Sequence, residues 1–293
     1  MTEPTELEDD PRSPLEQARA LRDALLRAEA MIGLLSVEEA ERLPGLYAAA
    51  AAAGATEAWR ELGDCWAEGI DVLGYQPEAA LDCYTRAQAA GDPGAPEALA
   101  RLALRGWPEA GPAAWAALQP AVAAGEPRAS LFASFLCTRR LGVEADPALA
   151  LRLAMVSAES GAPEGMFEVH VLLRSSGAPT DQSTAWCAKA AALGHPRALY
   201  NLGVFAAIGE GRPVDLAEAR ARYAVAAAAG SGLAAQNLAR MRRNGEGGPI
   251  DLPGAAEAAQ TAAALGYPVP GFEAEGENDG WDDEEGPEGA EPS

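Results

Sequence analysis

The sequence predicts an all-α protein, an α/α solenoid of about six helix-pair repeats behind an N-terminal helical cap. The first indication is a ladder of glycines that recur after every 33 to 37 residues, at Gly54, Gly91, Gly125, Gly161, Gly194, Gly230 and Gly266. Small residues keep phase with this ladder, eleven positions before each of its last six glycines. The composition is 48% hydrophobic but only 6% aromatic, which favours closely packed helices over a β-sandwich. Such a period is typical of stacked repeats.

The N-terminal region is predicted to hold a disordered segment and then the cap. Residues 1–13 are acidic and polar, without the basic and apolar parts of a secretory signal. No apolar run is long enough to span a membrane, so we expect a cytoplasmic chain without membrane insertion. Within residues 14–54, an apolar stripe predicts one helix over 14–34. A second helical stretch over 37–53 is expected to be interrupted at Pro44-Gly45, and together they form a helical cap or divergent repeat.

The fifth repeat shows the expected helix pair most clearly. Helix A, the first of the pair, is predicted over about 196–208, where a stretch rich in glycine and proline breaks it. Asp215 suits the N-cap of helix B, because its carboxylate accepts a hydrogen bond from an unpaired backbone N–H. Helix B then runs to Ala229, and Gly230 suits the left-handed residue that ends a helix. Repeats of this kind are predicted over 55–267.

Between ladder glycines the chain keeps a pattern of small residues, a Leu-Gly pair, a G-x-G loop, Asp and an aromatic residue. The fifth repeat carries it at Ala198, Leu202, Gly203, Gly209, Gly211, Asp215, Ala219, Tyr223, Ala226 and Ala227. This pattern resembles the Sel-one-like repeat (SLR) family, α/α relatives of the tetratricopeptide repeat, over roughly residues 54–266. The middle repeats depart from it: Ser134 and His170 replace the glycine of the Leu-Gly pair, and Leu118 and Ala154 replace the aromatic residue. The resemblance implies a right-handed superhelix whose inner groove binds a peptide or partner domain.

Candidate partner contacts lie on helix A of the last two repeats. Asn201 and Asn237 each follow a ladder glycine by seven residues. On tetratricopeptide-like arrays an asparagine near this position faces the groove, where its amide can bind a peptide backbone; alternatively, it caps a neighbouring turn. Arg197 and Arg240 are expected on the same helix faces, with Arg243 near the turn. Their guanidinium groups suit partner carboxylates, although arginines also form solvated faces.

Residues 268–293 are predicted to be a disordered acidic tail, since acidic residues dominate from Glu273 to Glu291. Trp281 stands within the run Gly-Trp-Asp-Asp-Glu-Glu. It suits a short motif for a basic, apolar groove, or a segment that folds back on the arginine-bearing helices. The alternative is a tail that only increases solubility.

Several functional classes are disfavoured by the sequence. The net charge of -22 opposes general binding to nucleic acid or anionic lipid and favours basic partners. The four cysteines lack a C-x-x-C pair and are expected to be reduced and buried. A nucleophile made of Cys137 or Cys187 with His170 stays open, but no catalytic motif accompanies it. Two histidines do not make a metal site, so neither a metal nor a cofactor is expected.

The leading hypothesis is therefore a non-enzymatic scaffold or adaptor that binds a protein or peptide in the concave groove. An alternative is a regulatory protein whose acidic tail competes for its own arginine-bearing face. A hydrolase with a Cys/His site ranks last, because nothing in the sequence activates such a nucleophile.

Overall fold

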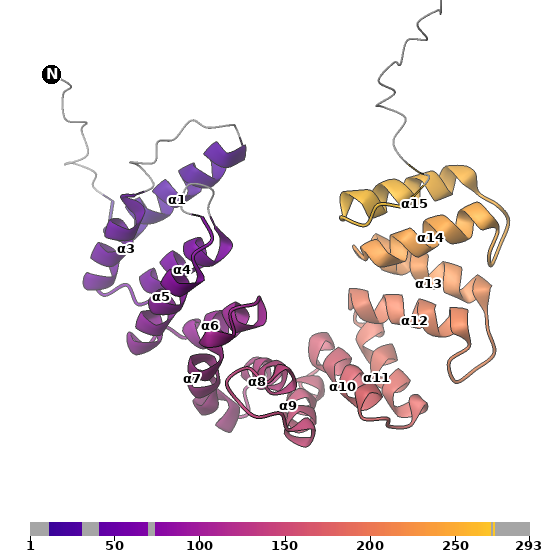
Figure 1. The fold of residues 1–293 in the computed structure, drawn as a ribbon, viewed down its shortest axis with the longest axis horizontal. Coiled ribbons are helices and arrows are strands. Elements are labelled where there is room, and N and C mark those ends of the chain that lie inside the picture. The colour runs from indigo at the N-terminus through magenta and orange to yellow at the C-terminus, as the bar shows by residue number, and fades with distance from the viewer. Residues whose placement is uncertain (1–11, 31–40, 70–73, 271, 273–293) are drawn as a thin grey trace, which may run out of the picture. The chain divides into compact units, whose positions relative to one another are not determined.

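A computed structural model describes residues 12–30, 41–69, 74–270 and 272, which form an all-α protein (Figure 1). The chain divides into two compact units, the first ending at Leu193 and the second beginning at Gly194. The described helices of the first unit are α1 (Pro14–Ala30), α3 (Leu43–Ala52), α4 (Ala58–Glu68), α5 (Pro77–Ala89), α6 (Ala95–Leu104), the 3-10 helix η1 (Pro108–Ala110), α7 (Gly111–Ala123), α8 (Pro127–Arg139), α9 (Pro147–Glu159), α10 (Pro163–Ser175) and α11 (Thr180–Ala192). Those of the second unit are α12 (Pro196–Ile208), α13 (Leu216–Ala228), α14 (Gly232–Asn244) and α15 (Leu252–Ala264).

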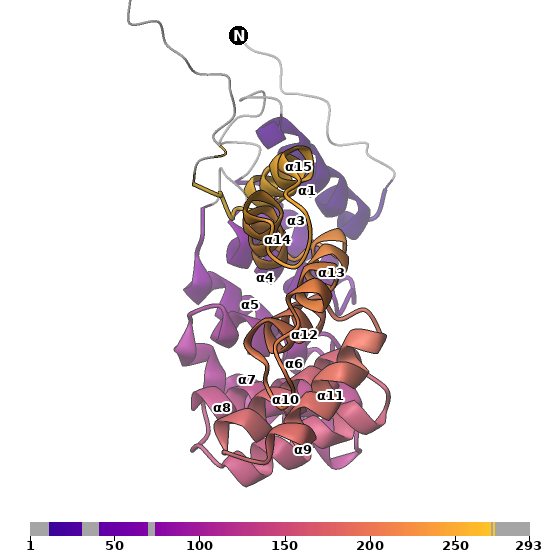
Figure 2. The same ribbon diagram turned by 90° about the vertical axis from the view of Figure 1, so that its right-hand side faces the viewer.

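Within each unit, every described α-helix packs against the next one along the chain. The first unit holds the pairs α4/α5, α6/α7, α8/α9 and α10/α11, and the second holds α12/α13 and α14/α15. In the second unit the four helices stack in chain order in both views (Figures 1 and 2). First helices of neighbouring pairs are also in contact: α4 contacts α6, and α6 contacts α8. We call the surface made by the first helices of the pairs within one unit the A-helix face of that unit; it is made by α4, α6, α8 and α10 in the first unit and by α12 and α14 in the second. The predicted all-α repeat fold is confirmed.

The glycine ladder marks the turns between pairs, as predicted. All seven ladder glycines have a positive φ, between 76° at Gly125 and 97° at Gly54, a conformation that glycine adopts without steric cost. A second series closes the first helix of each pair, at Gly69, Gly106, Gly177, Gly209 and Gly245. In the α8/α9 pair this place is taken by Arg140, with a φ of 60°, the one non-glycine residue of the described chain in this region. The middle repeats therefore keep the same turns.

Side-chain caps begin the helices where the sequence predicts them. The Asp215 carboxylate accepts the Glu218 N–H at 2.8 Å at the start of α13, and Asp146 and Asp251 cap α9 and α15 in the same way. The expected interruption at Pro44-Gly45 is wrong. These two residues lie in the first turn of α3, where a proline is tolerated because its missing N–H has no partner in the helix.

The small residues in phase with the ladder form the contacts between helices. Five are fully buried alanines and the sixth, Ser183, is 1% exposed; the alanines are Ala80, Ala114, Ala150, Ala219 and Ala255. Larger side chains fill the space beside them. A Cβ on Gly63 of α4 would lie 2.5 Å from the Tyr84 ring of α5, so glycine makes room for the aromatic residue.

The two residues that replace glycine in the middle repeats, Ser134 and His170, form hydrogen bonds to backbone carbonyl groups. The Ser134 hydroxyl donates to the Ala150 carbonyl at 2.9 Å, and Nδ1 of His170 lies 2.8 Å from the Ser183 carbonyl oxygen. Both side chains are buried. The polar groups that these two replacements bring into the core therefore have hydrogen-bond partners there.

Candidate partner-binding surface

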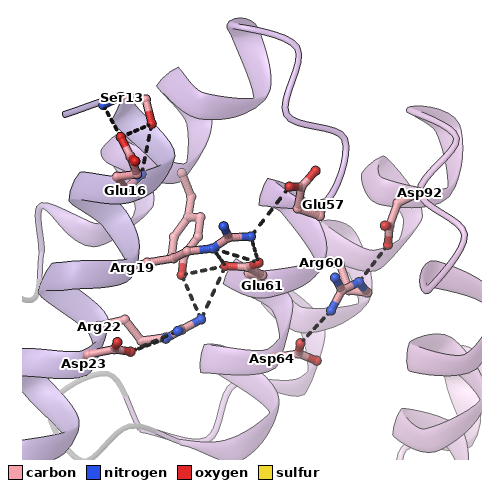
Figure 3. A network of polar contacts seen from close by, with 11 residues as sticks. Ser13, Glu16, Arg19, Arg22, Asp23, Glu57, Arg60, Glu61, Asp64 and Asp92 are labelled. Carbon is pink, nitrogen blue, oxygen red and sulfur yellow. Dashed lines mark hydrogen bonds and ion pairs between the residues drawn. The ribbon is translucent and has the colours of Figure 1, made fainter.

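The A-helix face of the first unit carries a network of charges that begins at α1 (Figure 3). The Arg19 guanidinium binds the Glu61 carboxylate of α4 and lies 3.5 Å from Glu57. Arg22 lies 3.3 Å from Glu61, and its Nη2 is 2.9 Å from Asp23. Burial opposes the ionisation of Glu61, but the hydrogen bond and charge of Arg19 outweigh it and lower the pKa of this carboxyl. The network therefore fixes α1 against the first repeat.

A second part of the network joins the first repeat to the next. The Arg60 guanidinium binds the Asp92 carboxylate at 2.8 Å and lies 3.4 Å from the Asp64 carboxylate. Asp92 is buried, with 5% of its surface exposed. Asp64 also accepts the hydroxyl of Tyr84 at 2.8 Å. Burial nevertheless raises the pKa of Asp64, because its neighbours only partly offset the lost hydration. Asp64 is thus a carboxylate with incomplete charge compensation.

Beside this network is a charged cleft of about 410 Å³, lined by α1, α4, α5 and α6. Its lining includes four carboxylates and three arginines, namely Asp23, Glu61, Asp64 and Glu68 with Arg22, Arg101 and Arg105. Apolar side chains, among them Leu26 and Leu102, complete the surface. We call this the charged cleft. Its mixed lining can hold a side chain that is apolar along its length and charged at its end.

An apolar cleft of about 390 Å³ lies further along the same unit, between α8, α9 and α10. Leu131, Phe132 and Phe135 of α8 line it, and the two phenylalanine rings meet edge to face with centroids 6.3 Å apart. Both rings are only partly buried. Arg128 and Glu164 also line this cleft and give it one charge of each sign.

The predicted asparagines lie in the second unit, on α12 and α14. Asn237 donates from Nδ2 to the Leu233 carbonyl at 3.2 Å and lies 3.5 Å from the Tyr200 hydroxyl. Asn201 follows Tyr200 on α12 and is partly buried. The Tyr200 ring in turn lies 5.7 Å from the Tyr223 ring, centroid to centroid. The structure therefore brings Asn237 to the helix that carries Asn201, through a tyrosine that the sequence analysis did not single out.

The predicted arginines occupy different environments. Arg197 is exposed in the first turn of α12. Arg240 binds both oxygens of Glu246 at 2.6 Å. Arg243 donates to the Pro270 carbonyl at 3.3 Å, and its guanidinium carbon lies 5.0 Å from the centroid of the Phe272 ring. The described start of the expected tail therefore lies against α14, while Trp281 lies outside the described residues.

The residues of the possible hydrolase site are inside the first unit. Cys137, Cys187 and His170 are at most 1% exposed. Burial raises the pKa of the Cys187 thiol to about 12, so it is a poor nucleophile at neutral pH. All four cysteines are free and buried, as predicted. Over the described ranges, no three metal-binding side chains gather in one place, and no helix is long and apolar enough to cross a membrane.

Sequence reasoning missed both clefts of the first unit. The charged cleft is lined by α1, which precedes the first ladder glycine, and by helices of the repeats after Gly54, whereas the apolar cleft is lined by residues on either side of Gly161. The sequence does contain a signal for the charged cleft, because Asp64 and Arg101 each stand ten residues after a ladder glycine. They lie on the same helix face as Glu61 and Ala98, which stand seven residues after the same glycines. Opposite charges at one position of consecutive repeats indicate a charged surface across those repeats.

No family model and no curated protein matches the sequence. Among solved structures, the chain is similar to a Sel1 repeat protein from Oxalobacter formigenes, with 23% identity and a TM-score of 0.50 over 91% of this chain and 94% of that one. It is also similar to a protective antigen of uropathogenic Escherichia coli strains that displays an SLR fold, with 22% identity and a TM-score of 0.53. That match covers 79% of this chain and 49% of the antigen. The chain therefore has the fold of the Sel1-like repeat (SLR) proteins.

Proposed function

We propose that this chain is a non-enzymatic scaffold or adaptor that binds a protein or peptide segment on the A-helix face of its first unit. The observation that carries the proposal is the apolar cleft between α8, α9 and α10. Phe132 and Phe135 present partly exposed rings there, and large aromatic side chains in a concave site are the usual anchors of a protein interface. The SLR fold agrees with this role, because stacked repeats form extended binding surfaces.

The surroundings of the apolar cleft suit a peptide rather than a small hydrophobic ligand. Arg128 and Glu164 at its edge can bind the polar groups of a partner backbone or its charged side chains. Arg128 is already paired with Glu97 of α6 and is therefore held in place. An apolar anchor with a polar rim is the arrangement that protein interfaces use.

Affinity purification from the native cells tests this proposal. The full chain is compared with Phe135→Ala, which removes an aromatic anchor, and with Tyr75→Ala as a matched control. Tyr75 is an aromatic residue of the same unit, 54% exposed and outside the cleft. We expect a defined protein to be recovered with the full chain and the control but depleted with Phe135→Ala. Equal recovery with all three baits would refute the use of this cleft.

The second unit offers further candidate contacts on its own A-helix face. Asn201, Asn237, Arg197 and Arg240 belong to α12 and α14, and we propose that they extend the partner-binding surface to the last repeats. The amide oxygen of Asn237 can accept a partner N–H, since the contacts of Asn237 with Leu233 and Tyr200 use Nδ2. Asn201→Ala combined with Asn237→Ala is expected to weaken partner binding, whereas unchanged binding would limit the surface to the first unit.

A second candidate function is regulation by the acidic tail, which the contacts of Arg243 favour. This arginine binds the Pro270 carbonyl and stacks on Phe272, and Gln236 donates to the Pro268 carbonyl at 3.2 Å. Pro268, Pro270 and Phe272, which precede the acidic residues 273–293 in the sequence, therefore contact α14. If the tail competes with the partner, removing residues 273–293 should raise partner affinity several-fold, most at low salt. The same affinity with and without the tail would exclude competition.

A further inference from the structure

The charged cleft contains a carboxylate pair on its α4 wall. Asp64 and Glu68 are one turn apart on α4 and both line the cleft. Arg101 of α6 and Arg105, the C-cap residue of α6, also line the cleft and have the same spacing. The side chain of Asp64 is 34% exposed, so it is open to the cleft while most of its hydration is lost. A pair of carboxylates in such a site attracts a cation.

The other charges of the cleft are largely neutralised by their neighbours. Arg22 is paired with Asp23 and Glu61, and Arg101 lies 2.8 Å from Glu97 outside the cleft lining. Glu68 forms no ion pair with any residue that the structure describes, and neither does the exposed Arg105. The cleft lining therefore keeps more carboxylates than arginines. Asp64 accepts the Tyr84 hydroxyl, forms an ion pair with Arg60 at 3.4 Å and also interacts electrostatically with Arg101.

Apolar surface reaches to the same carboxylates. Leu26 of α1 lines the cleft and is 45% exposed, whereas the lining residues Leu102 and Ala98 of α6 are buried, at 2% and 1% exposed. Lysine and arginine side chains place their methylene stems along such surface while the charged end stays at a polar site. The geometry of the cleft thus fits one long basic side chain better than a small metal cation, which would need convergent oxygen ligands.

We propose that the charged cleft binds a lysine or arginine side chain of the partner segment, with its cation beside Asp64 and Glu68. This inference rests on the proposed function and adds the chemistry of the partner to it. The net charge of -22 further favours a basic partner, because it raises the local concentration of positive segments around the chain. Burial raises the pKa of Asp64 although Arg60 and Arg101 act to lower it, so a further cation in the cleft would stabilise the charged carboxylate.

The test begins with peptides selected from a random 12-residue library by the full-length protein. We expect the selected sequences to be enriched in lysine or arginine at one position. Isothermal titration then measures the Kd of a selected peptide for the full chain and for Asp64→Asn with Glu68→Gln, which keep shape and hydrogen-bond acceptors but remove both charges. The double variant is expected to bind at least ten-fold more weakly. A ten-fold loss together with basic enrichment supports the proposal.

A matched control comes from the other helix of the same repeat. Glu78 and Asp82 of α5 are also four residues apart and exposed, and Glu78→Gln with Asp82→Asn removes the same charge away from the cleft. This control is expected to change the Kd less than two-fold. An equal loss in both double variants would show only an effect of net charge and would overturn the cleft assignment. Circular dichroism melting of each variant identifies any loss of fold.

A third variant separates a basic ligand from an acidic one. Arg105→Gln removes a positive charge from the cleft, so a bound lysine or arginine should bind the same or more tightly. Weaker binding by Arg105→Gln, with acidic enrichment in the peptides, would overturn the proposal in favour of carboxylate recognition. Peptides whose binding is lost in Phe135→Ala but not in Asp64→Asn with Glu68→Gln would overturn this inference and leave the proposed function standing. Failure to select any peptide would contradict both.

Discussion

The ring of Tyr223 on α13 packs directly against the backbone of Gly203 on α12. A Cβ at position 203 would lie 2.7 Å from two carbons of that ring, closer than carbon atoms pack in proteins. Tyr84 and Gly63 form the same contact in the first repeat. The glycine of the Leu-Gly pair is therefore required by the aromatic residue of the second helix, and not by a special backbone conformation.

This contact predicts that Gly203→Ala destabilises the protein by about 1–3 kcal/mol, the usual cost of overpacking a core. The sign is informative, because the same change in an open helix position stabilises by about 1 kcal/mol. Urea unfolding measures it. Gly45→Ala on α3, where a Cβ meets nothing within 4 Å, is the matched control and should stabilise. Combining Gly203→Ala with Tyr223→Leu should recover much of the loss; purely additive effects would contradict the contact.

Arg140 predicts a stabilising substitution. Its φ of 60° and ψ of 37° are left-handed, which costs a non-glycine residue roughly 1–2 kcal/mol. Arg140→Gly should raise the free energy of unfolding by about 1 kcal/mol in urea, although glycine also gains freedom in the unfolded chain. Arg139→Gly, at the last helical residue of α8, is the control and should destabilise. A loss of stability in Arg140→Gly would mean that the arginine side chain makes contacts worth more than the strain.

Glu61 predicts a dependence of stability on pH. Its folded pKa lies below the ordinary value, since Arg19 and Arg22 outweigh burial. The carboxylate therefore stabilises the fold above its unfolded pKa of about 4.3, and this contribution is lost as the pH falls through the lower folded pKa. Glu61→Gln should lower the free energy of unfolding by about 1–3 kcal/mol at pH 7. The difference between Glu61→Gln and the parent should shrink on acidification below about pH 4.3; a difference that stays constant would contradict the ion pairing.

The cysteines predict slow thiol chemistry in the folded chain. Burial raises the pKa of Cys65 and Cys187 to about 12 and that of Cys83 to about 11, so few thiolates exist at pH 8. Alkylation by iodoacetamide, measured by mass spectrometry, should be slow in buffer. It should be fast in concentrated urea, because urea unfolds the chain and exposes the thiols. Rapid native modification of Cys187 would reopen the possibility of a nucleophile.

The turns and caps of the fold were predictable because they depend on local backbone chemistry. Gly230 needs a positive φ, and Asp215 needs only the N–H of the first turn that follows it. Pro44-Gly45 shows the limit of this reasoning. A proline breaks a helix when it lies in the interior, but it is well tolerated in the first turn. The sequence alone did not show which of these two positions Pro44 occupies.

The ion pairs beside the charged cleft were not predictable because they join residues that are distant in sequence. Glu61 takes its guanidinium partner from Arg19, 42 residues before it, and Arg60 finds Asp92 32 residues later. Asn237 lies on the first helix of its pair, α14, but its contact with Tyr200 depends on how α12 and α14 pack. Repeat phase predicts which residues share a face, whereas packing between repeats decides which of them meet.

The central claim is that the A-helix face of the first unit holds a partner segment. Its most direct test is the Kd, by isothermal titration, of a peptide selected by the full-length protein. Phe132→Ala with Phe135→Ala is compared with the parent and with the exposed control Tyr75→Ala. The account predicts at least a ten-fold weaker Kd for the double variant, as for buried aromatic anchors, and no change for the control. An unchanged Kd in a double variant that still melts cooperatively would contradict it.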